Sequence, residues 1–325
     1  MIRKLLIVLG LFFMLGCTED SSVKELKLAH SLSNSHPVHK AMTYFAERVA
    51  LHSEGKMEIK IYPSSQLGSE RECLELLQLG SLAMTKVSSA VMENFSPKLK
   101  VFGYPYLFES KEQRYALYDS DLGKELLADG EKYWLHGLTY FDAGSRSFYT
   151  KNTPITKPSD LKGLKVRVMQ SPTAIKLVNA MGGSPTPVSW GELYTSLQQG
   201  VVDGAENNLP SFYSSKHYEI CKNLCLDKHS SLPDILVMSS IIYEDLNEQE
   251  KNVLRLSAQE AAIEQRRLWE KAEKESLVEI KKAGVKVTEP DIEVFKKESE
   301  AIITNLKSEN PELYKLIQEI KSIQP

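Results

Sequence analysis

Hydrophobic and polar positions follow two periods over the first quarter of the chain. Residues 25–30 and 57–62 alternate at every second position, as is typical of short strands. Between them, apolar side chains recur every three or four positions, which predicts a helix over 35–55 with Ser35 as its cap and a stripe of Val38, Met42, Phe45 and Val49. A second helix is predicted over 70–79. This succession favours a parallel sheet with right-handed crossovers.

The same succession returns in the middle of the chain, with a strand over 163–168 and helices over 171–181 and 191–199. A helical pattern without Gly or Pro then runs from Asn247 to Ala283. It is longer than a normal globular helix, so we expect it to brace two lobes. The expected fold class is α/β, with two lobes that share a long helix. We assign 25–144 and 230–272 to lobe I, and 145–229 and 273–325 to lobe II.

The N-terminus differs from the rest of the chain in its order of basic and apolar residues. Two basic residues precede an apolar run at 5–15, which predicts a secretory signal peptide over 1–16. The run is shorter than the ~20 residues of a membrane span, although an uncleaved anchor is the alternative. The sequence MLGC at 14–17 resembles a bacterial lipobox. It predicts a lipidated Cys17 at the mature N-terminus, a polar tether over 17–24, and a periplasmic protein that lipid alone anchors to the membrane.

Composition narrows the class of protein. The chain has 325 residues, of which 42% are hydrophobic and 26% charged, and its net charge is −3. These values exclude a mostly disordered chain and a polytopic membrane protein. They also lack the basic excess of a nucleic-acid-binding protein, so no nucleic-acid partner is expected.

Four cysteines are too few for a disulfide scaffold in a chain of this length. Cys73 lies in an apolar helical pattern and is expected to be buried. Cys221 and Cys225 are four positions apart and match no zinc spacing. A disulfide between them and two free thiols both remain open.

No motif for nucleotide binding or hydrolysis is present, including the P-loop, the dinucleotide fingerprint, HExxH and GxSxG. His36 and His39 lie three apart at a helix start, where a metal pair is conceivable but a histidine serving the helix or solvent is more common. We therefore expect no metal, no cofactor and no catalytic residue.

Two arginines are better candidates for chemistry. Arg167 lies near the carboxyl end of an apolar strand, at the edge where α/β sheets bind ligands. Arg146 lies in a loop of small residues. A guanidinium suits bidentate carboxylate recognition, and two together favour an anion site over separate structural salt bridges. Asn207 and Asn208 offer donors in a turn, unless they only serve that turn. Trp190 is either a core residue or an aromatic wall of the site.

Four segments make the chain similar to a known family: YPSSQLG at 62–68, LKGLKVRV at 161–168, GSPTP at 183–187 and LQQGVVDGAEN at 197–207. Over nearly the whole chain from Glu25, the sequence resembles the solute receptors of tripartite ATP-independent periplasmic (TRAP) transporters, the DctP type. The resemblance implies a two-lobed periplasmic-binding-protein fold. It also implies a receptor rather than an enzyme. Such a receptor closes on an organic acid and delivers it to a small and a large membrane subunit.

The resemblance also assigns roles to individual residues. Arg167 matches the arginine that binds the ligand carboxylate in this family, and Arg146 matches a second ligand-facing arginine. Asn207 matches an asparagine that contacts the same end of the ligand. Trp190 occupies a position that is usually aromatic.

The residues expected at the end of the site away from the ligand carboxylate indicate the substrate. Receptors of the sialic-acid type carry an acidic residue in the segment that is here 87–90, and this chain has none. The segments 28–31, 69–72 and 143–149 resemble instead the branch that binds hexuronates, such as D-glucuronate or D-galacturonate. The polar partners expected for the sugar hydroxyls are His30, Ser31, Glu70 and Asp234. A C4-dicarboxylate or another small carboxylate is the alternative, although no second cationic clamp is evident. A secreted hydrolase is a more distant one.

Overall fold

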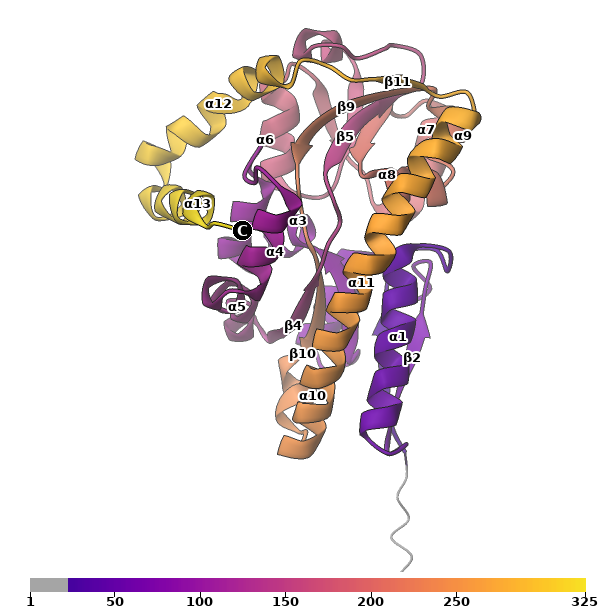
Figure 1. Ribbon diagram of the computed structural model, residues 1–325, viewed down its shortest axis with the longest axis vertical. Helices are drawn as coiled ribbons and strands as arrows, with labels where there is room; N and C mark the ends of the chain where they lie inside the picture. The colour runs from indigo at the N-terminus through magenta and orange to yellow at the C-terminus, as the bar shows by residue number, and fades with distance from the viewer. Residues whose placement is uncertain (1–22) are drawn as a thin grey trace, which may run out of the picture.

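The computed structural model describes residues 23–325, so the expected signal peptide over 1–16 and the expected lipidation at Cys17 lie outside the described residues. Two sheets with helices on their faces form two lobes, stacked along the long axis of the molecule (Figure 1). The α/β two-lobed fold expected from the sequence is confirmed.

Lobe I is built on a five-stranded sheet of order β2-β1-β3-β10-β4. Its strands are β1 (Lys24–Ala29), β2 (Met57–Tyr62), β3 (Met84–Ser88), β4 (Leu135–Phe141) and β10 (Asp234–Ser239). Its helices are α1 (Pro37–His52), α2 (Glu70–Gln78), α3 (Ser89–Met92), η1 (Pro97–Gly103), α4 (Lys111–Asp119), α5 (Asp121–Ala128), η2 (Glu131–Tyr133) and α10 (Ser240–Glu244).

Lobe II is built on a six-stranded sheet of order β11-β9-β5-β8-β6-β7. Its strands are β5 (Arg146–Thr150), β6 (Lys165–Val168), β7 (Ser184–Pro187), β8 (Gly204–Asn207), β9 (Asn223–Ser230) and β11 (Lys286–Thr288). Its helices are η3 (Pro158–Leu161), α6 (Pro172–Ala180), α7 (Trp190–Gln199), α8 (Leu209–Ser214) and α9 (His217–Ile220).

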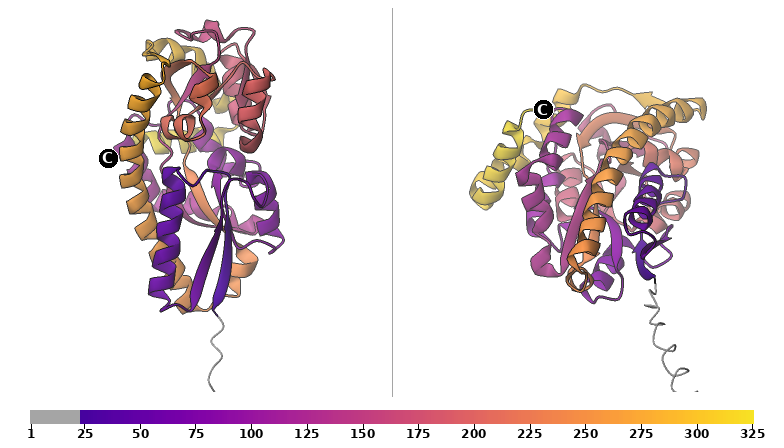
Figure 2. Two further views of the ribbon diagram at one scale, coloured as in Figure 1. Left: turned by 90° about the vertical axis from the view of Figure 1, so that its right-hand side faces the viewer. Right: turned by 60° about the horizontal axis from the view of Figure 1, so that its bottom comes forward.

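The chain passes between the lobes four times, and the first three connections lie before α12. The chain crosses from β4 to β5 through residues 142–145 and returns from β9 to β10 through 231–233. Helix α11 (Glu248–Lys282) is the third connection; it packs on α1 in lobe I, reaches α8 in lobe II, and runs along one side of both lobes (Figures 1 and 2). Asn247 and Glu250 form the capping box that the sequence predicts at its start.

The last two helices return from lobe II to lobe I. Helix α12 (Ile292–Glu309) buries Phe295 in the core of lobe II and Leu306 in that of lobe I. Helix α13 (Pro311–Ser322) then buries Ile317 and Ile320 in the lobe I core. The segment 273–325, predicted as part of lobe II, is therefore shared between the lobes at its C-terminal end.

The parallel pairing predicted from the strand–helix succession is confirmed for β1, β2 and β3, but each sheet also contains antiparallel strands that were not predicted. Strand β10 is antiparallel to β3 and β4, and β5 is antiparallel to β8 and β9. The physical reason is the hinge, because a strand that crosses between lobes enters the next sheet from its opposite end. The strand–helix units themselves, such as β1-α1-β2, are parallel as expected.

Two local predictions also need correction. The cap of α1 is His36 rather than Ser35, since its ring Nδ1 accepts the backbone N–H of Val38 at 3.2 Å. Asn207, predicted to lie in a turn, is the last residue of strand β8, and Asn208 caps the helix that follows by accepting the N–H of Ser211 at 2.8 Å.

Each lobe has a hydrophobic cluster on either face of its sheet. The alternation along β10 shows why, because Ile235 and Val237 enter one cluster while Leu236 and Met238 enter the other. In lobe II, Cys221 and Cys225 belong to different clusters and are free thiols, so the disulfide alternative is not realised. Cys73 is buried, as predicted.

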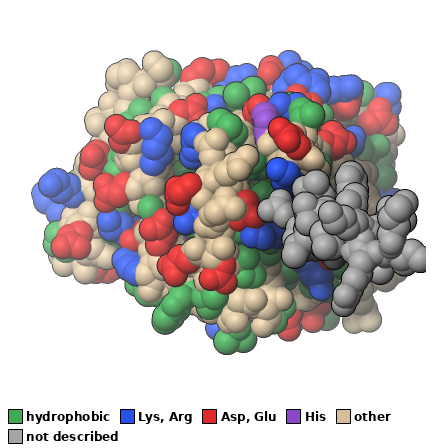
Figure 3. Space-filling model, turned by 90° about the horizontal axis from the view of Figure 1, so that it is seen from below, with side chains coloured by type: hydrophobic (Ala, Val, Ile, Leu, Met, Phe, Trp, Pro, Cys, Tyr) green, Lys and Arg blue, Asp and Glu red, His purple; other side chains and the backbone are tan. Residues whose placement is uncertain are grey.

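No helix between residues 23 and 325 is long and apolar enough to cross a membrane. Acidic and basic side chains are interspersed over the part of the lower face that Figure 3 draws in colour.

Candidate ligand-binding site

A cavity of about 70 Å³ lies between the two lobes. The carboxyl ends of β1 and β3 reach it from lobe I, and those of β6 and β8 reach it from lobe II, as is typical of ligand crevices in α/β proteins. Eight of the nine predicted ligand residues line it: Ser31, Glu70, Arg146, Arg167, Trp190, Asn207, Asn208 and Asp234. His30 is the exception.

Arg167 is the side chain best prepared to bind an anion. It is 2% exposed, its Nε donates to the carbonyl oxygen of Val188 at 2.9 Å, and its Nη1 has no hydrogen-bond partner among the described residues. Its guanidinium lies 5.8 Å from the centre of the Trp190 ring. Burial lowers the pKa of Arg167, although an arginine stays charged in proteins. The result is a buried cation with free donors facing the cavity.

Arg146 differs from Arg167 because its charge is already compensated. It is the first residue of β5 rather than part of a loop, which corrects the sequence prediction. Its Nη2 donates to a carboxylate oxygen of Glu206 at 2.9 Å, and its Nη1 donates to the Asn207 side-chain oxygen at 2.8 Å. Arg146 therefore fixes Asn207 at the cavity wall while Glu206 holds its guanidinium.

Glu206 belongs to a buried chain of charges that the sequence analysis did not identify. His229 lies between two carboxylates, with Nδ1 2.7 Å from Asp227 and Nε2 3.5 Å from Glu206. Burial opposes the charged form of Glu206, but Arg146 and His229 lower its pKa to about 2. Burial likewise opposes protonation of His229, but Asp227 and Glu206 raise its pKa to about 9. Cationic and anionic side chains alternate along this network from Arg146 to Asp227, so each cation in it has an anionic partner. Arg167 is not part of the network and remains an uncompensated cation.

We expect the free energy of unfolding to fall as the pH rises from about 6.5 to about 9, because His229 keeps its proton in the folded state and loses it in the unfolded state over this window. Its contribution is complete below pH 6.5 and is lost above the folded-state pKa. Chemical unfolding of the parent and of His229→Gln at several pH values measures this. A slope that stays the same in His229→Gln would contradict the assignment.

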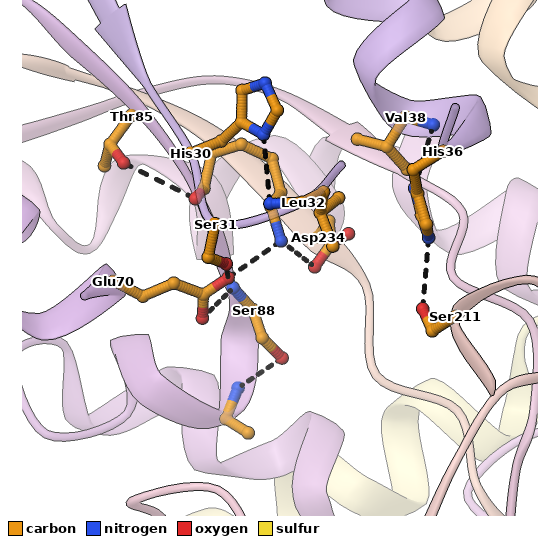
Figure 4. A network of polar contacts seen from close by, with 12 residues as sticks. His30, Ser31, Leu32, His36, Val38, Glu70, Thr85, Ser88, Ser211 and Asp234 are labelled. Carbon is orange, nitrogen blue, oxygen red and sulfur yellow. Dashed lines mark hydrogen bonds and ion pairs between the residues drawn. The ribbon is translucent and has the colours of Figure 1, made fainter. Parts of the chain in front are cut away.

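Lobe I contributes a buried cation of its own, Lys86, which was not predicted from the sequence. It is 2% exposed in the middle of β3, and its Nζ lies 2.8 Å from Glu70 and 3.2 Å from Asp234. Burial opposes its charge, but the carboxylates of Asp234 and Glu70 raise its pKa. Glu70 and Asp234 approach the same point from different elements (Figure 4). The sequence contains one indication of this pair, because Lys86 is the only charged residue in the mostly apolar run 82–87. A lysine buried in such a run requires a charged partner.

Ser31 and Ser88 complete this end of the cavity. The Ser31 hydroxyl donates to Glu70 at 3.4 Å, and the backbone N–H of Ser88 donates to the other oxygen of Glu70 at 3.2 Å. Glu70 also begins α2, where the helix dipole favours a carboxylate. These contacts hold the carboxylate in a fixed orientation at the cavity wall.

His30 serves the scaffold rather than the cavity. Its Nδ1 accepts the backbone N–H of Leu32 at 3.1 Å, its Nε2 lies 3.0 Å from His39, and its ring points away from Glu70 and Asp234 (Figure 4). Burial, Lys86 and His39 lower its pKa to about 3, so the ring is neutral. No group of side chains in residues 23–325 has the arrangement of a metal site.

Two buried contacts join the lobes beside the cavity. Glu93, just after α3, accepts bonds from the Ser171 hydroxyl at 2.8 Å and from the N–H and hydroxyl of Thr173 at 3.0 and 2.8 Å, at the start of α6. His36 of lobe I lies 3.1 Å from the Ser211 hydroxyl of lobe II (Figure 4). Both contacts stabilise the conformation in which the lobes touch.

We expect Glu93→Ala to weaken ligand binding by about 10- to 100-fold, because hydrogen bonds to a charged group contribute about 1.5–3 kcal/mol and these exist only when the lobes meet. Calorimetric titration measures the change. Glu125→Ala, which removes an exposed glutamate of the same lobe, is the matched control. Equal affinity in Glu93→Ala and the parent would show that the contact does not contribute to closure.

Comparison with known proteins identifies the family. The model of "Bacterial extracellular solute-binding protein, family 7" (DctP) matches residues 28–310. A TRAP periplasmic solute-binding protein from Xanthobacter autotrophicus, solved with β-D-galacturonate, is 34% identical, with a TM-score of 0.88 over 92% of this chain and 100% of that one. One from Chromohalobacter salexigens, solved with D-glucuronate, is 35% identical, with the same TM-score and coverage.

A third structure widens the range of bound acids. A TRAP solute-binding protein from Polaromonas sp. JS666, solved with D-erythronate, is 32% identical, with a TM-score of 0.88 over 93% of this chain and 99% of that one. The family match, these likenesses and the cavity between two lobes lead to one conclusion. The chain belongs to family 7 of the bacterial extracellular solute-binding proteins and is a solute receptor of the TRAP type.

Proposed function

We propose that this receptor binds a sugar acid with a single carboxylate, of the hexuronate class to which D-glucuronate and D-galacturonate belong. The observation that carries the proposal is the difference between Arg167 and Lys86, buried cations at opposite ends of the cavity. Arg167 has free donors and no carboxylate partner, whereas Lys86 is paired with Glu70 and Asp234. One anionic group can therefore be neutralised at the Arg167 end, and the Lys86 end is already neutralised.

The remaining side chains suit a polyhydroxyl body. Carboxylate oxygens of Glu70 and Asp234 accept bonds from hydroxyls, and Ser31 and Asn207 can complement them. Trp190 offers an apolar ring face beside Arg167. The galacturonate and glucuronate bound to the two relatives are consistent with this chemistry. We infer no ligand contact for His30.

The alternative, a C4-dicarboxylate receptor, requires a second free cation. Lys86, Arg146 and Arg71, the other cations of the cavity wall, are all paired with carboxylates. A thermal-shift screen over hexuronates, aldonates and C4-dicarboxylates tests the proposal, because a ligand at a hundredfold excess over its Kd adds about 2.7 kcal/mol to the stability of the folded state. We expect the largest shifts with hexuronates. Shifts with succinate or malate and none with a uronate would overturn the substrate assignment but not the family.

We further propose that the loaded receptor delivers its ligand, chemically unchanged, to a small and a large membrane subunit. These subunits are the partners that the family implies.

We propose lipidation of Cys17 as the anchor, supported by the apolar run at 5–15 and the MLGC sequence that ends at this residue. We expect mass spectrometry of the protein from its native membrane to show a diacylglyceryl adduct on an N-terminal Cys17, and Cys17→Ser to lack it. An unmodified N-terminus would contradict this prediction.

A further inference from the structure

Lys86 is a buried ammonium at the wall of the ligand cavity, at the end formed by lobe I. Two of its three donors are occupied, at 2.8 Å by Glu70 and at 3.2 Å by Asp234. Arg167 lines the same cavity from lobe II. The cavity thus has a free cation, Arg167, at the lobe II end and a paired one, Lys86, at the lobe I end. The other two cations of its wall are also paired, Arg146 with Glu206 and Arg71 with Glu75.

The partners of Lys86 come from separate parts of the fold. Glu70 begins α2, and Asp234 begins β10 directly after a hinge crossing. Lys86 lies opposite Leu236 in the antiparallel pair of β3 and β10, and this register places Asp234 diagonally next to it. One carboxylate would suffice to pair a buried lysine, so the second one has a separate effect. With it, the summed charge of Lys86, Glu70 and Asp234 is −1 when both carboxyl groups are ionised and zero when one of them is protonated.

We propose that Lys86 is a masked second carboxylate site, and that Glu70 and Asp234 set the preference of this receptor for singly over doubly charged sugar acids. The inference rests on the proposed function, because it takes the Arg167 end as the site of the first carboxylate. In the parent protein, a second ligand carboxylate would meet two carboxyl groups that already share the ammonium. A sugar hydroxyl at the same place donates to those groups instead.

The proposal predicts a change of specificity when the mask is removed. Glu70→Gln and Asp234→Asn keep the size of each side chain and its carbonyl oxygen, so contacts such as that from the Ser88 N–H can persist. They leave Lys86 as an uncompensated cation. The cavity would then carry a free cation at each end, which suits a dicarboxylate.

The test is calorimetric titration with D-galacturonate, which has one carboxylate, and galactarate, which has one at each end of the same six-carbon skeleton. The parent should bind galacturonate and prefer it strongly. The double variant Glu70→Gln/Asp234→Asn should shift the ratio of the two affinities toward galactarate by about 100-fold, since like charges placed together cost several kcal/mol. Each single variant should show a smaller shift.

The triple variant that adds Lys86→Met is the matched control. It has the same two amides but no cation, so the gain for galactarate should disappear while the thermal midpoint shows that the protein is folded. Galactarate binding to the double variant no better than to the parent would overturn the inference, as would a gain that persists in the triple variant. A parent that binds neither D-galacturonate nor D-glucuronate would overturn the proposed function instead, so the two failures are distinguishable.

Discussion

Replacement of Arg167 by alanine is expected to weaken sugar-acid binding by two to three orders of magnitude. The ligand carboxylate would enter a buried cavity without its cation, and an uncompensated buried charge costs about 3–5 kcal/mol. In the parent protein, the hydrogen bond from Nε to the Val188 carbonyl oxygen holds the guanidinium in place, and alanine removes this group together with its free donors. Arg146 is not expected to substitute, because its guanidinium is bound to Glu206 and Asn207. Calorimetric titration with D-galacturonate measures the loss.

Arg167→Lys should recover little of this affinity, because an ammonium lacks the planar fork that holds a carboxylate by two bonds. Arg267→Ala is the matched control, since it removes an exposed arginine of α11 that is paired with Glu264. Parent-like affinity in Arg167→Ala would place the carboxylate elsewhere.

Replacement of Lys86 by methionine is expected to lower the stability of the folded protein by about 3–5 kcal/mol, which is a fall of the thermal midpoint by roughly 10 °C. Methionine fills much of the space of the lysine chain but leaves Glu70 and Asp234 facing each other without a cation. The loss follows from the unpaired carboxylates rather than from packing. A thermal melt without ligand measures it.

The same three positions supply the control. Lys86→Met combined with Glu70→Gln and Asp234→Asn removes all three charges, so no buried ion is left without a partner, which is what makes a broken buried pair costly. We expect most of the lost stability to return. A triple variant as unstable as Lys86→Met would attribute the loss to packing at β3.

Much of the architecture follows from local patterns in the sequence. The stripe of Val38, Met42, Phe45 and Val49 is the buried face of α1. The uninterrupted helical pattern from Asn247 gives a helix that ends at Lys282, within one residue of its predicted end. Arg167 was identifiable because a charged residue inside an apolar strand needs a reason to be buried, and its place at the strand end gives one.

The features that the sequence did not reveal depend on contacts between distant segments. The burial of Lys86 is explained only by its contacts with Glu70 and Asp234, which are 16 and 148 residues away in the sequence. Arg146 looked like a free clamp because its partner Glu206 is 60 residues distant. The direction of the His30 ring is set by His39 and Leu32, which local alternation does not indicate. The antiparallel strands arise from the hinge crossings, where the chain changes sheet.

We expect this receptor to bind a sugar acid with one carboxylate. Isothermal titration of the purified protein with D-glucuronate, D-galacturonate, succinate and malate tests it most directly. At least one uronate should bind saturably with a stoichiometry of about one, because a single free cation among the described residues faces the cavity, and neither dicarboxylate should bind. Saturable binding of succinate or malate, with no heat from either uronate, would contradict it.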